Sequence, residues 1–256
     1  MTNDAFFTRD GESYIPAPAA RGPWSPNSLH GRVIIALIGH ELERLHGGPE
    51  WTPVRLTVDM YRLPDFSPIT AATRIVRGGK RIKVVDCELM SGGLSIARGT
   101  CQFLLRSQNA PGVSWSPPDW DVPKPDELPS PGPGQFGERM WKMRNITGPF
   151  DSAPKQRSAW MSEIRELVAG IPLTPFVRVA SAADFASPLA NRSDVGLGYI
   201  NTDVTIYLHR LPKGEWIGFQ ATNHRASDGV AIGECFLYDI EGAIGTATVA
   251  ALRQSR

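Results

Sequence analysis

Asp184 is the acidic residue whose sequence surroundings point most clearly to chemistry. It lies in Thr174–Leu189, a short Ala-rich apolar run that predicts a buried helix. Burying a lone carboxylate costs several kcal/mol unless the group is paired or neutralised. A carboxylate kept at that cost is a candidate general base or nucleophile. A structural alternative stays open, in which Asp184 is satisfied by a neighbouring N–H, by Arg178 or Arg192, or by water.

The segment that carries Asp184 belongs to an internal repeat. Residues 57–64 read TVDMYRLP and residues 205–212 read TIYLHRLP, an offset of 212 − 64 = 148 residues. At the same offset, residues 96–100 (IARGT) fall on residues 244–248 (IGTAT). Solenoid units repeat every 20–50 residues or so, which is much shorter than this period. The repeat therefore predicts two copies of one small domain.

The two copies define the expected domain organisation. The N-terminal domain is predicted over residues 1–107 and the C-terminal domain over residues 136–256. Between them, residues 108–135 contain eight prolines and predict an extended linker. Within this linker, Trp115 and Trp120 are expected to pack against the surface of a domain.

Each copy is predicted to contain one apolar helix followed by four hairpin-linked strands. The first helix is expected over residues 29–45, with Ser28 as its N-cap and Gly47–Gly48 as its stop. In the first copy, strands are expected at residues 54–63, 69–77, 81–90 and 94–106. In the second copy, they are expected at residues 199–211, 216–226, 230–240 and 243–253. Two further strand-like segments, 136–146 and 157–166, precede the helix of the second copy. This order predicts an α+β fold, in which a curved antiparallel sheet wraps around each helix. Two such sheets can pair edge to edge, which removes one exposed edge from each.

Composition narrows the class of protein. A hydrophobic fraction of 41% and a charged fraction of 21% are typical of a soluble globular protein. A net charge of +1 gives no reason to expect nucleic acid or an anionic membrane as partner. No apolar stretch approaches the roughly 18 residues of a membrane span, and residues 1–13 do not resemble a signal peptide. The three cysteines all fall in strand-like runs, which predicts buried free thiols and a cytoplasmic location.

Several short strings resemble acyl-CoA thioesterase II and the wider thioesterase-like superfamily. They are Gly22–Pro23–Trp24, His30–Gly31, Gly79–Lys80–Arg81, Ala182–Ala183–Asp184–Phe185 and Tyr207–Leu208–His209–Arg210. The resemblance implies a double hotdog fold, with two antiparallel sheets each wrapped around a central helix. It also implies hydrolysis of acyl-CoA thioesters to free acid and CoA, with no cofactor and no metal. Hotdog units commonly associate, so a homo-oligomer that forms through the sheets is expected.

The resemblance also assigns catalytic residues. The family places an Asp on the second helix, a Thr on the next strand and a Gln on the last strand. The Asp carries over to Asp184, whereas Asn201 replaces the Thr, with Thr202 following it, and Thr248 stands at the Gln position. The resemblance thus implies Asp184 as general base or nucleophile, Asn201 and Thr202 as groups that position water or substrate, and Thr248 as a weak assistant. Asp203 is expected to be solvated.

The repeat gives an independent check on this set. Subtracting 148 from 184, 201 and 248 gives Ala36, Pro53 and Thr100 in the first copy. The polar set is therefore present in one copy only, which predicts one active site per chain.

Substrate-binding residues are expected in the first copy. His30 and Gly31 begin the first helix, where a side chain and free N–H groups can meet a carbonyl or a phosphate. Arg77, Lys80 and Arg81 surround a glycine turn and are predicted to contact the phosphates of CoA. Capping or packing by His30, and solubility for the basic turn, are the open alternatives. Arg32 departs from the family, in which a second Gly is commoner after His-Gly.

Two other hotdog functions compete with hydrolysis. A hydratase needs Asp, then Asn-Pro, then His, whereas residues 184–190 read DFASPLA, so this class is disfavoured. A protein that binds acyl-CoA without hydrolysing it is the alternative, because the family Gln is missing.

Overall fold

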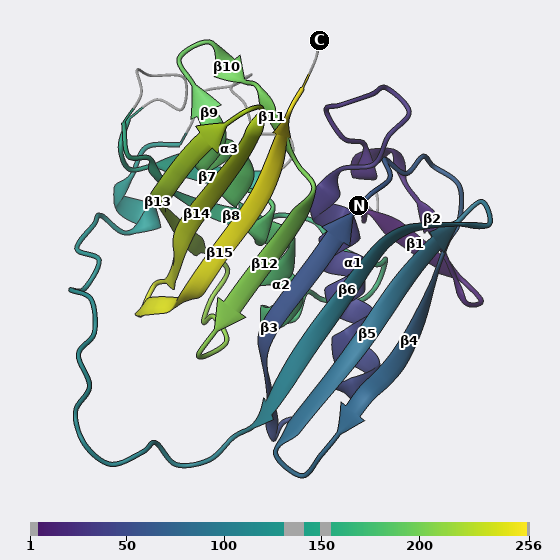
Figure 1. The fold of residues 1–256 in the computed structure, drawn as a ribbon, viewed down its shortest axis with the longest axis horizontal. Helices are drawn as coiled ribbons and strands as arrows, with labels where there is room; N and C mark the ends of the chain where they lie inside the picture. Colours follow the sequence, from purple (N-terminus) through teal and green to yellow (C-terminus); the bar gives the residue numbers. More distant parts are fainter. Residues whose placement is uncertain (1–4, 131–140, 149–154, 255–256) are drawn as a thin grey trace.

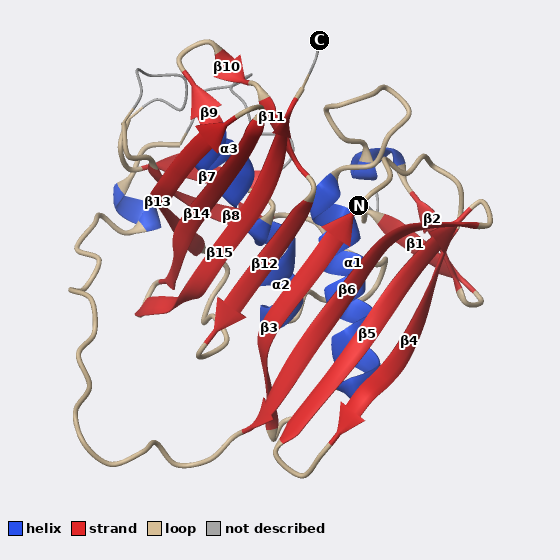
Figure 2. Ribbon diagram, in the orientation of Figure 1, coloured by secondary structure: helices blue, strands red, loops and turns tan. Residues whose placement is uncertain are grey.

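Strands from both halves of the chain form one continuous antiparallel sheet (Figures 1 and 2), which has 13 strands in the described part of the chain. The computed structural model describes residues 5–130, 141–148 and 155–254. The sheet has the order β1-β2-β4-β5-β6-β3-β12-β15-β14-β13-β8-β7, with β11 also pairing with β15. The two predicted sheets are therefore joined at β3 and β12, and the expected edge-to-edge pairing is confirmed.

The three α-helices found among the described residues lie against one face of this sheet (Figure 2). They are α1 (Gly31–His46), α2 (Pro175–Ala183) and α3 (Ala186–Asn191), and 3-10 turns occur at Pro18–Ala20 and Pro125–Glu127. The strands are β1 (Phe7–Asp10), β2 (Ser13–Pro16), β3 (Trp51–Met60), β4 (Ile69–Gly78), β5 (Ile82–Ser91), β6 (Leu94–Leu105), β7 (Trp141–Asn145), β8 (Ser158–Glu163), β9 (Arg192–Ser193), β10 (Gly196–Leu197), β11 (Tyr199–Asn201), β12 (Asp203–Leu208), β13 (Ile217–Ser227), β14 (Val230–Asp239) and β15 (Gly242–Arg253).

The internal repeat is visible in the strand boundaries. Adding 148 to the bounds of β5 and β6 gives 230–239 and 242–253, which are the bounds of β14 and β15. The junction between the copies shows the same relation, because Thr57 of β3 pairs directly with Thr205 of β12. The Oγ1 atoms of these two threonines are 3.1 Å apart. The same residue of each copy therefore meets its counterpart at the centre of the sheet.

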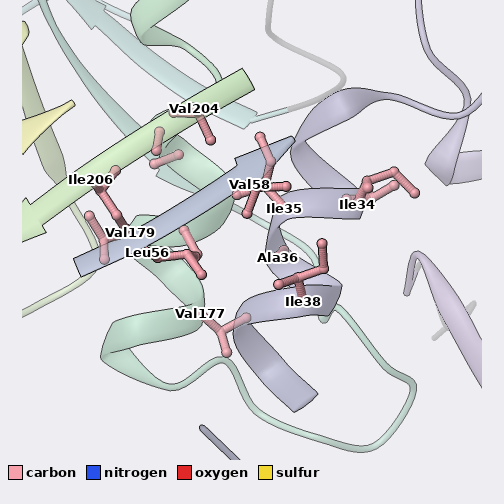
Figure 3. Close-up of a cluster of buried hydrophobic side chains, with 14 of the residues drawn as sticks. Ile34, Ile35, Ala36, Ile38, Leu56, Val58, Val177, Val179, Val204 and Ile206 are labelled. Carbon is pink, nitrogen blue, oxygen red and sulfur yellow. The ribbon is translucent and has the colours of Figure 1, made fainter. Parts of the chain in front are cut away.

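The hydrophobic core is shared between the two copies. Apolar side chains of α1 and α2 pack together and against β3 and β12 (Figure 3). The helices approach closely, since a β-carbon at Gly39 of α1 would lie 3.2 Å from the β-carbon of Ala180 in α2. Each aliphatic side chain buried here contributes roughly 1.5–3 kcal/mol. Neither copy thus has a separate core.

The predicted helix at residues 174–189 is divided in two, which changes the setting of Asp184. Helix α2 starts after Thr174, whose hydroxyl accepts from the Val177 N–H, and it ends at Ala183. A continuous helix would need an N–H at residue 188 to bond the carbonyl of Asp184, and Pro188 has none. Pro188 is tolerated in the first turn of α3, where no such bond is required. Asp184 therefore lies at a helix junction rather than on a helix face.

Two other helix and linker predictions need correction. The N-cap of α1 is His30, whose Nδ1 lies 3.3 Å from the Arg32 N–H, whereas the Ser28 hydroxyl bonds the carbonyl of Ser25. In the linker, Trp120 stacks on Tyr238 with ring centres 4.1 Å apart, as expected. Trp115 is instead 86% exposed.

Strand predictions were largely confirmed, with two gaps. The N-terminal hairpin of β1 and β2, which extends the sheet beyond β4, was not predicted. The predicted strand at residues 136–146 corresponds to β7, and its first residues lie outside the described part of the chain. Among the described residues, no helix is long and apolar enough to cross a membrane.

Candidate active site

Asp184 is the centre of a polar group built from both copies of the repeat. Its side chain is largely buried at the junction of α2 and α3. Oδ2 lies 3.1 Å from Nδ1 of His30, the N-cap of α1. Oδ1 accepts a hydrogen bond of 2.9 Å from the side-chain amide of Asn201, at the end of β11. The sequence predictions for Asp184, His30 and Asn201 therefore converge on one point in space.

The N-terminus of α1 faces this carboxylate. A β-carbon at Gly31 would lie 3.1 and 3.2 Å from the two oxygens of Asp184, so a larger residue would crowd the site. The first N–H groups of a helix have no partner within the helix, and the helix dipole makes this end partly positive. The start of α1 thus provides a setting that favours negative charge.

Asp184 is held as a carboxylate. Burial alone would raise the pKa of Asp184, but the hydrogen bond and charge of His30 lower it. The hydrogen bond from Asn201 and the charge of Arg32 act in the same direction, and the net pKa lies below its ordinary value. An ionised carboxylate is therefore present at the site near neutral pH.

Arg32 contributes to this site from a buried position. Its guanidinium pairs with the carboxylate of Glu163, and both side chains are 1% exposed. The guanidinium also lies over the rings of Phe6 and Trp141, at 4.8 and 4.6 Å from their centres. Because Glu163 balances its charge, Arg32 can remain buried within reach of Asp184. Arg32 stands where the family more commonly has a second Gly, and Glu163 is its ion-pair partner.

Two cavities meet at Asp184. The larger has a volume of about 630 Å³, and it is lined by Trp24, Leu29, Gly31, Ile34, Asp59, Met60, Tyr61, Arg62, Leu63, Pro64, Asp184, Ile200, Asn201, Thr202, Asp203, Ala250 and Leu252. The smaller has a volume of about 60 Å³ and is lined by Pro23, Trp24, His30, Arg32, Trp141, Met161, Ser181, Asp184, Phe185, Ser187, Pro188, Leu197 and Asn201. Trp24, Asp184 and Asn201 line both. The carboxylate therefore separates a ligand-sized pocket from a small chamber.

Comparison with known proteins decides the family. The family model for the acyl-CoA thioesterase C-terminal domain matches residues 115–252, and the model for the N-terminal domain matches residues 20–104. The chain belongs to the acyl-CoA thioesterase family. It is therefore a thioesterase. Comparison with curated proteins gave no match.

Solved structures show the fold of this thioesterase. A conserved protein with a hotdog fold from Alicyclobacillus acidocaldarius has a TM-score of 0.75 at 16% identity, and the match covers 99% of this chain and 97% of that one. A tesB protein from Mycobacterium avium subspecies paratuberculosis has a TM-score of 0.70 at 14% identity, and the match covers 97% of this chain and 96% of that one. An acyl-CoA thioesterase II from Mycobacterium marinum has a TM-score of 0.64 at 18% identity, and the match covers 92% of this chain and 96% of that one. The chain has the hotdog fold in the form of one continuous sheet.

Thr202 and Thr248, two of the predicted site residues, lie in different places relative to the larger cavity. Thr202 lines the larger cavity, and its hydroxyl donates to the carbonyl of Ala250. Thr248 pairs with Thr205 and sits between the buried residues Ala247 and Val249, so its side chain points to the sheet face away from the helices. The structure does not bring Thr248 to Asp184.

Ala251 is the residue of β15 that lies beside the site. It pairs directly with Asn201, and directly paired residues project to the same face of a sheet. Ala251 has no polar side-chain atom, so β15 supplies no third polar group next to Asp184. Asp203 also differs from expectation, because it is half-buried and accepts from the Ala250 N–H at 2.6 Å. Burial, offset in part by this bond, and the nearby charge of Asp59 raise the pKa of Asp203.

The basic turn of the thioesterase lies away from Asp184. Arg77, Lys80 and Arg81 lie at or next to the connection between β4 and β5, beyond the C-terminal end of α1, where His46 bonds Thr73 (Figure 1). Helix α1 has 16 residues and so spans about 24 Å from this end to the Asp184 end. None of the three basic residues lines either cavity. Their contact with CoA stays a prediction. The described residues contain no cluster of His, Cys, Asp and Glu that fits a metal ion.

Proposed function

We propose that this thioesterase hydrolyses acyl-CoA thioesters to free acid and CoA at the centre formed by Asp184. The observation that carries the proposal is the carboxylate of Asp184, held by Asn201 and His30 on the wall of the larger cavity. Activation of the attacking water depends on this carboxylate. Family membership supports the reaction type, and the geometry supports the location.

Besides activation of water, the reaction needs hydrogen-bond donors for the thioester carbonyl, and the N-terminus of α1 supports this requirement. Attack on a thioester carbonyl places negative charge on its oxygen, which needs preorganised hydrogen-bond donors. Gly31 lines the larger cavity next to Asp184 and has no side chain that would cover its N–H. A carbonyl at this position would meet the positive end of the helix dipole. The amide of Asn201, on the other side of Asp184, orients the carboxylate.

The larger cavity supports an acyl-CoA ligand. Its volume of about 630 Å³ lies within the range of roughly 300–1,000 Å³ that small-molecule sites occupy. Apolar side chains such as Ile34, Met60 and Leu252 share its wall with the polar groups of Thr202 and Arg62. A thioester that enters here would bring its carbonyl carbon to Asp184 and Gly31.

The direct test is a hydrolysis panel over short, medium, long and aromatic acyl-CoAs, followed through the released thiol. We expect steady turnover of at least one ester by the purified chain. Saturable binding of acyl-CoA without thiol release would instead identify a non-catalytic acyl-CoA-binding protein and contradict the proposal.

We further propose that the protein forms a homo-oligomer through its sheets and that the basic turn contacts CoA phosphates. The first is checked by light scattering on the eluted protein, and a monomer would contradict it. The second is checked by replacing Arg77, Lys80 and Arg81 with Gln. An unchanged KM for acyl-CoA would remove these residues from the binding site. A cytoplasmic location, proposed from the free thiols, is checked by cell fractionation.

A further inference from the structure

His30 is held in one orientation at the start of α1. Its Nδ1 lies 3.1 Å from Oδ2 of Asp184, and its side chain is 14% exposed. The ring stands edge-on to Trp141, with ring centres 6.1 Å apart and planes at 80°. Contacts on one nitrogen and on the ring together leave little freedom for the imidazole to turn.

The position of the proton on His30 follows from its neighbours. The Arg32 N–H, at 3.3 Å from Nδ1, would need a lone pair on that nitrogen. The ionised carboxylate of Asp184, at 3.1 Å, needs a proton there. One nitrogen cannot serve both, and a charged acceptor makes the stronger hydrogen bond. The proton therefore lies on Nδ1, and Nε2 carries the lone pair.

The small chamber is the cavity that His30 lines. Among the residues that the structure describes, Nε2 has no hydrogen-bond partner, and it is not one of the buried unpaired side-chain atoms. His30 lines the chamber of about 60 Å³ but not the larger cavity. Water occupies roughly 30 Å³ per molecule in the liquid, so the chamber has room for water but not for a CoA ester.

We infer that His30 is a catalytic residue whose Nε2 accepts the proton of the attacking water, while Asp184 orients the ring through Nδ1. The inference rests on the proposed function and names the atom that receives the proton. The same division of roles between carboxylate, imidazole and nucleophile operates in Ser-His-Asp triads. Here water replaces the serine hydroxyl.

The step balances without any co-reactant beyond water. The water oxygen forms a bond to the carbonyl carbon, and one water proton moves to Nε2 of His30. The C–S bond then breaks, and its electron pair leaves with the sulfur of CoA. His30 returns the proton to this sulfur, and the acid product releases the other water proton to solvent. The products are a carboxylate and CoA thiol, and His30 ends in its starting state.

Other charged side chains lie around Arg32, next to the pair of His30 and Asp184. On α1, Arg32 pairs with Glu163 of β8, and the backbone carbonyl of Glu163 also accepts from Arg178 of α2. Arg165, next to β8, adds to the positive charge around Arg32. Asp184 is the carboxylate in direct contact with the ring. When His30 takes up a proton, the carboxylate of Asp184 therefore balances the new positive charge.

His30→Asn separates catalysis from positioning. The Asn amide can donate to Asp184 where Nδ1 now lies, and Asn is a favourable N-cap, but it has no basic nitrogen. We expect kcat/KM to fall about 10²–10⁴-fold with Tm and KM retained. In His30→Gly, added imidazole should restore part of the lost rate. A folded His30→Asn variant that retains wild-type kcat/KM would overturn the assignment.

The pH profile of the unmodified enzyme gives a second test that does not depend on a variant. If Asp184 acts alone as the base, kcat/KM persists until that carboxyl protonates, and its lowered pKa moves this point to more acidic pH. If another group is the base, kcat/KM is lost while Asp184 is still ionised, and carbon-detected NMR of the carboxyl follows that ionisation in parallel. A rate that is lost only in step with the protonation of Asp184 would overturn the role of His30. If no acyl-CoA is hydrolysed at any pH, the proposed function itself fails.

Discussion

Gly31 and Asp184 are packed so closely that a β-carbon at Gly31 would lie 3.1 Å from Oδ1 of Asp184. The two residues belong to different copies of the repeat, one at the start of α1 and the other at the junction of α2 and α3. A side chain at residue 31 would force the carboxylate or the helix N-terminus to move by a few tenths of an ångström. The geometry around Asp184 thus depends on a glycine at position 31.

Gly31→Ala is expected to impair catalysis more than folding. The added methyl group must push the Asp184 carboxylate aside by a few tenths of an ångström or more, away from His30 and Asn201. Small misplacements of this kind cost on the order of 10²-fold in rate. We therefore expect kcat/KM to fall about 10–100-fold while Tm stays close to wild type. Activity is measured by thiol release and Tm by circular dichroism.

Gly39→Ala is the matched control, with the same substitution in the same helix. Its methyl group would meet Ala180 rather than Asp184, so it is expected to change Tm and leave kcat/KM unchanged. Equal loss of activity in both variants would show that the Gly31 effect comes from general disturbance of α1.

Replacing Arg32 with Leu should destabilise the fold strongly. The substitution leaves the carboxylate of Glu163 buried without its cation, which typically costs about 3–5 kcal/mol. Urea unfolding measures the difference. Arg74→Ala is the control, because its ion pair with Asp86 is formed by a side chain 71% exposed and should contribute less than about 1 kcal/mol. If Arg32→Leu is as stable as the wild type, the buried pair does not stabilise the fold.

The same Arg32→Leu variant should shift the titration of Asp184. The charge of Arg32 is one of the causes that lower the pKa of Asp184, so its removal raises that pKa. A group with a raised pKa protonates at higher pH when acid is added. Carbon-detected NMR of the Asp184 carboxyl should therefore show protonation earlier in an acid titration than in the wild type, and an unchanged curve would argue against this coupling.

The three cysteines should not react in the folded protein. Cys87, Cys101 and Cys235 are free and buried, and burial raises the pKa of each thiol, to about 12 for Cys87. Thiolate is the reactive form, so a thiol reagent should label three groups per chain only after denaturation. Rapid labelling of the native protein would show that a strand carrying one of them opens. Slow labelling also keeps the assay for released CoA free of background.

The architecture of the sheet was predictable because strand patterns and turn glycines are local signals. The repeat gave more than local structure, since its offset of 148 residues brings Thr57 opposite Thr205 at the junction of the copies. The position of Asp184 at a helix junction was also within reach of the sequence. Pro188 lacks the N–H that a continuous helix would need there, and this signal was missed.

The contacts of the candidate active site were less predictable because they join residues far apart in the chain. Asp184 and Asn201 were found through the resemblance, but the approach of His30 to Asp184 depends on how α1 packs against the second copy. The resemblance, aligned through Leu252–Arg253, selected Thr248 rather than Ala251. The register of β15 against β11 and β12, which only the pairing reveals, decides which of these residues lies beside Asn201.

The most direct test of the account compares Asp184→Asn with the wild type in acyl-CoA hydrolysis. Asn has the same shape but cannot hold a negative charge against His30, so we expect kcat/KM to fall about 10²–10⁴-fold with Tm retained. Asp86→Asn is the control, because Asp86 is also buried and paired but lies in the sheet of the first copy, and it should keep its activity. A wild-type enzyme that hydrolyses an acyl-CoA, with Asp184→Asn equally active, would contradict the central claim that this carboxylate is the catalytic centre.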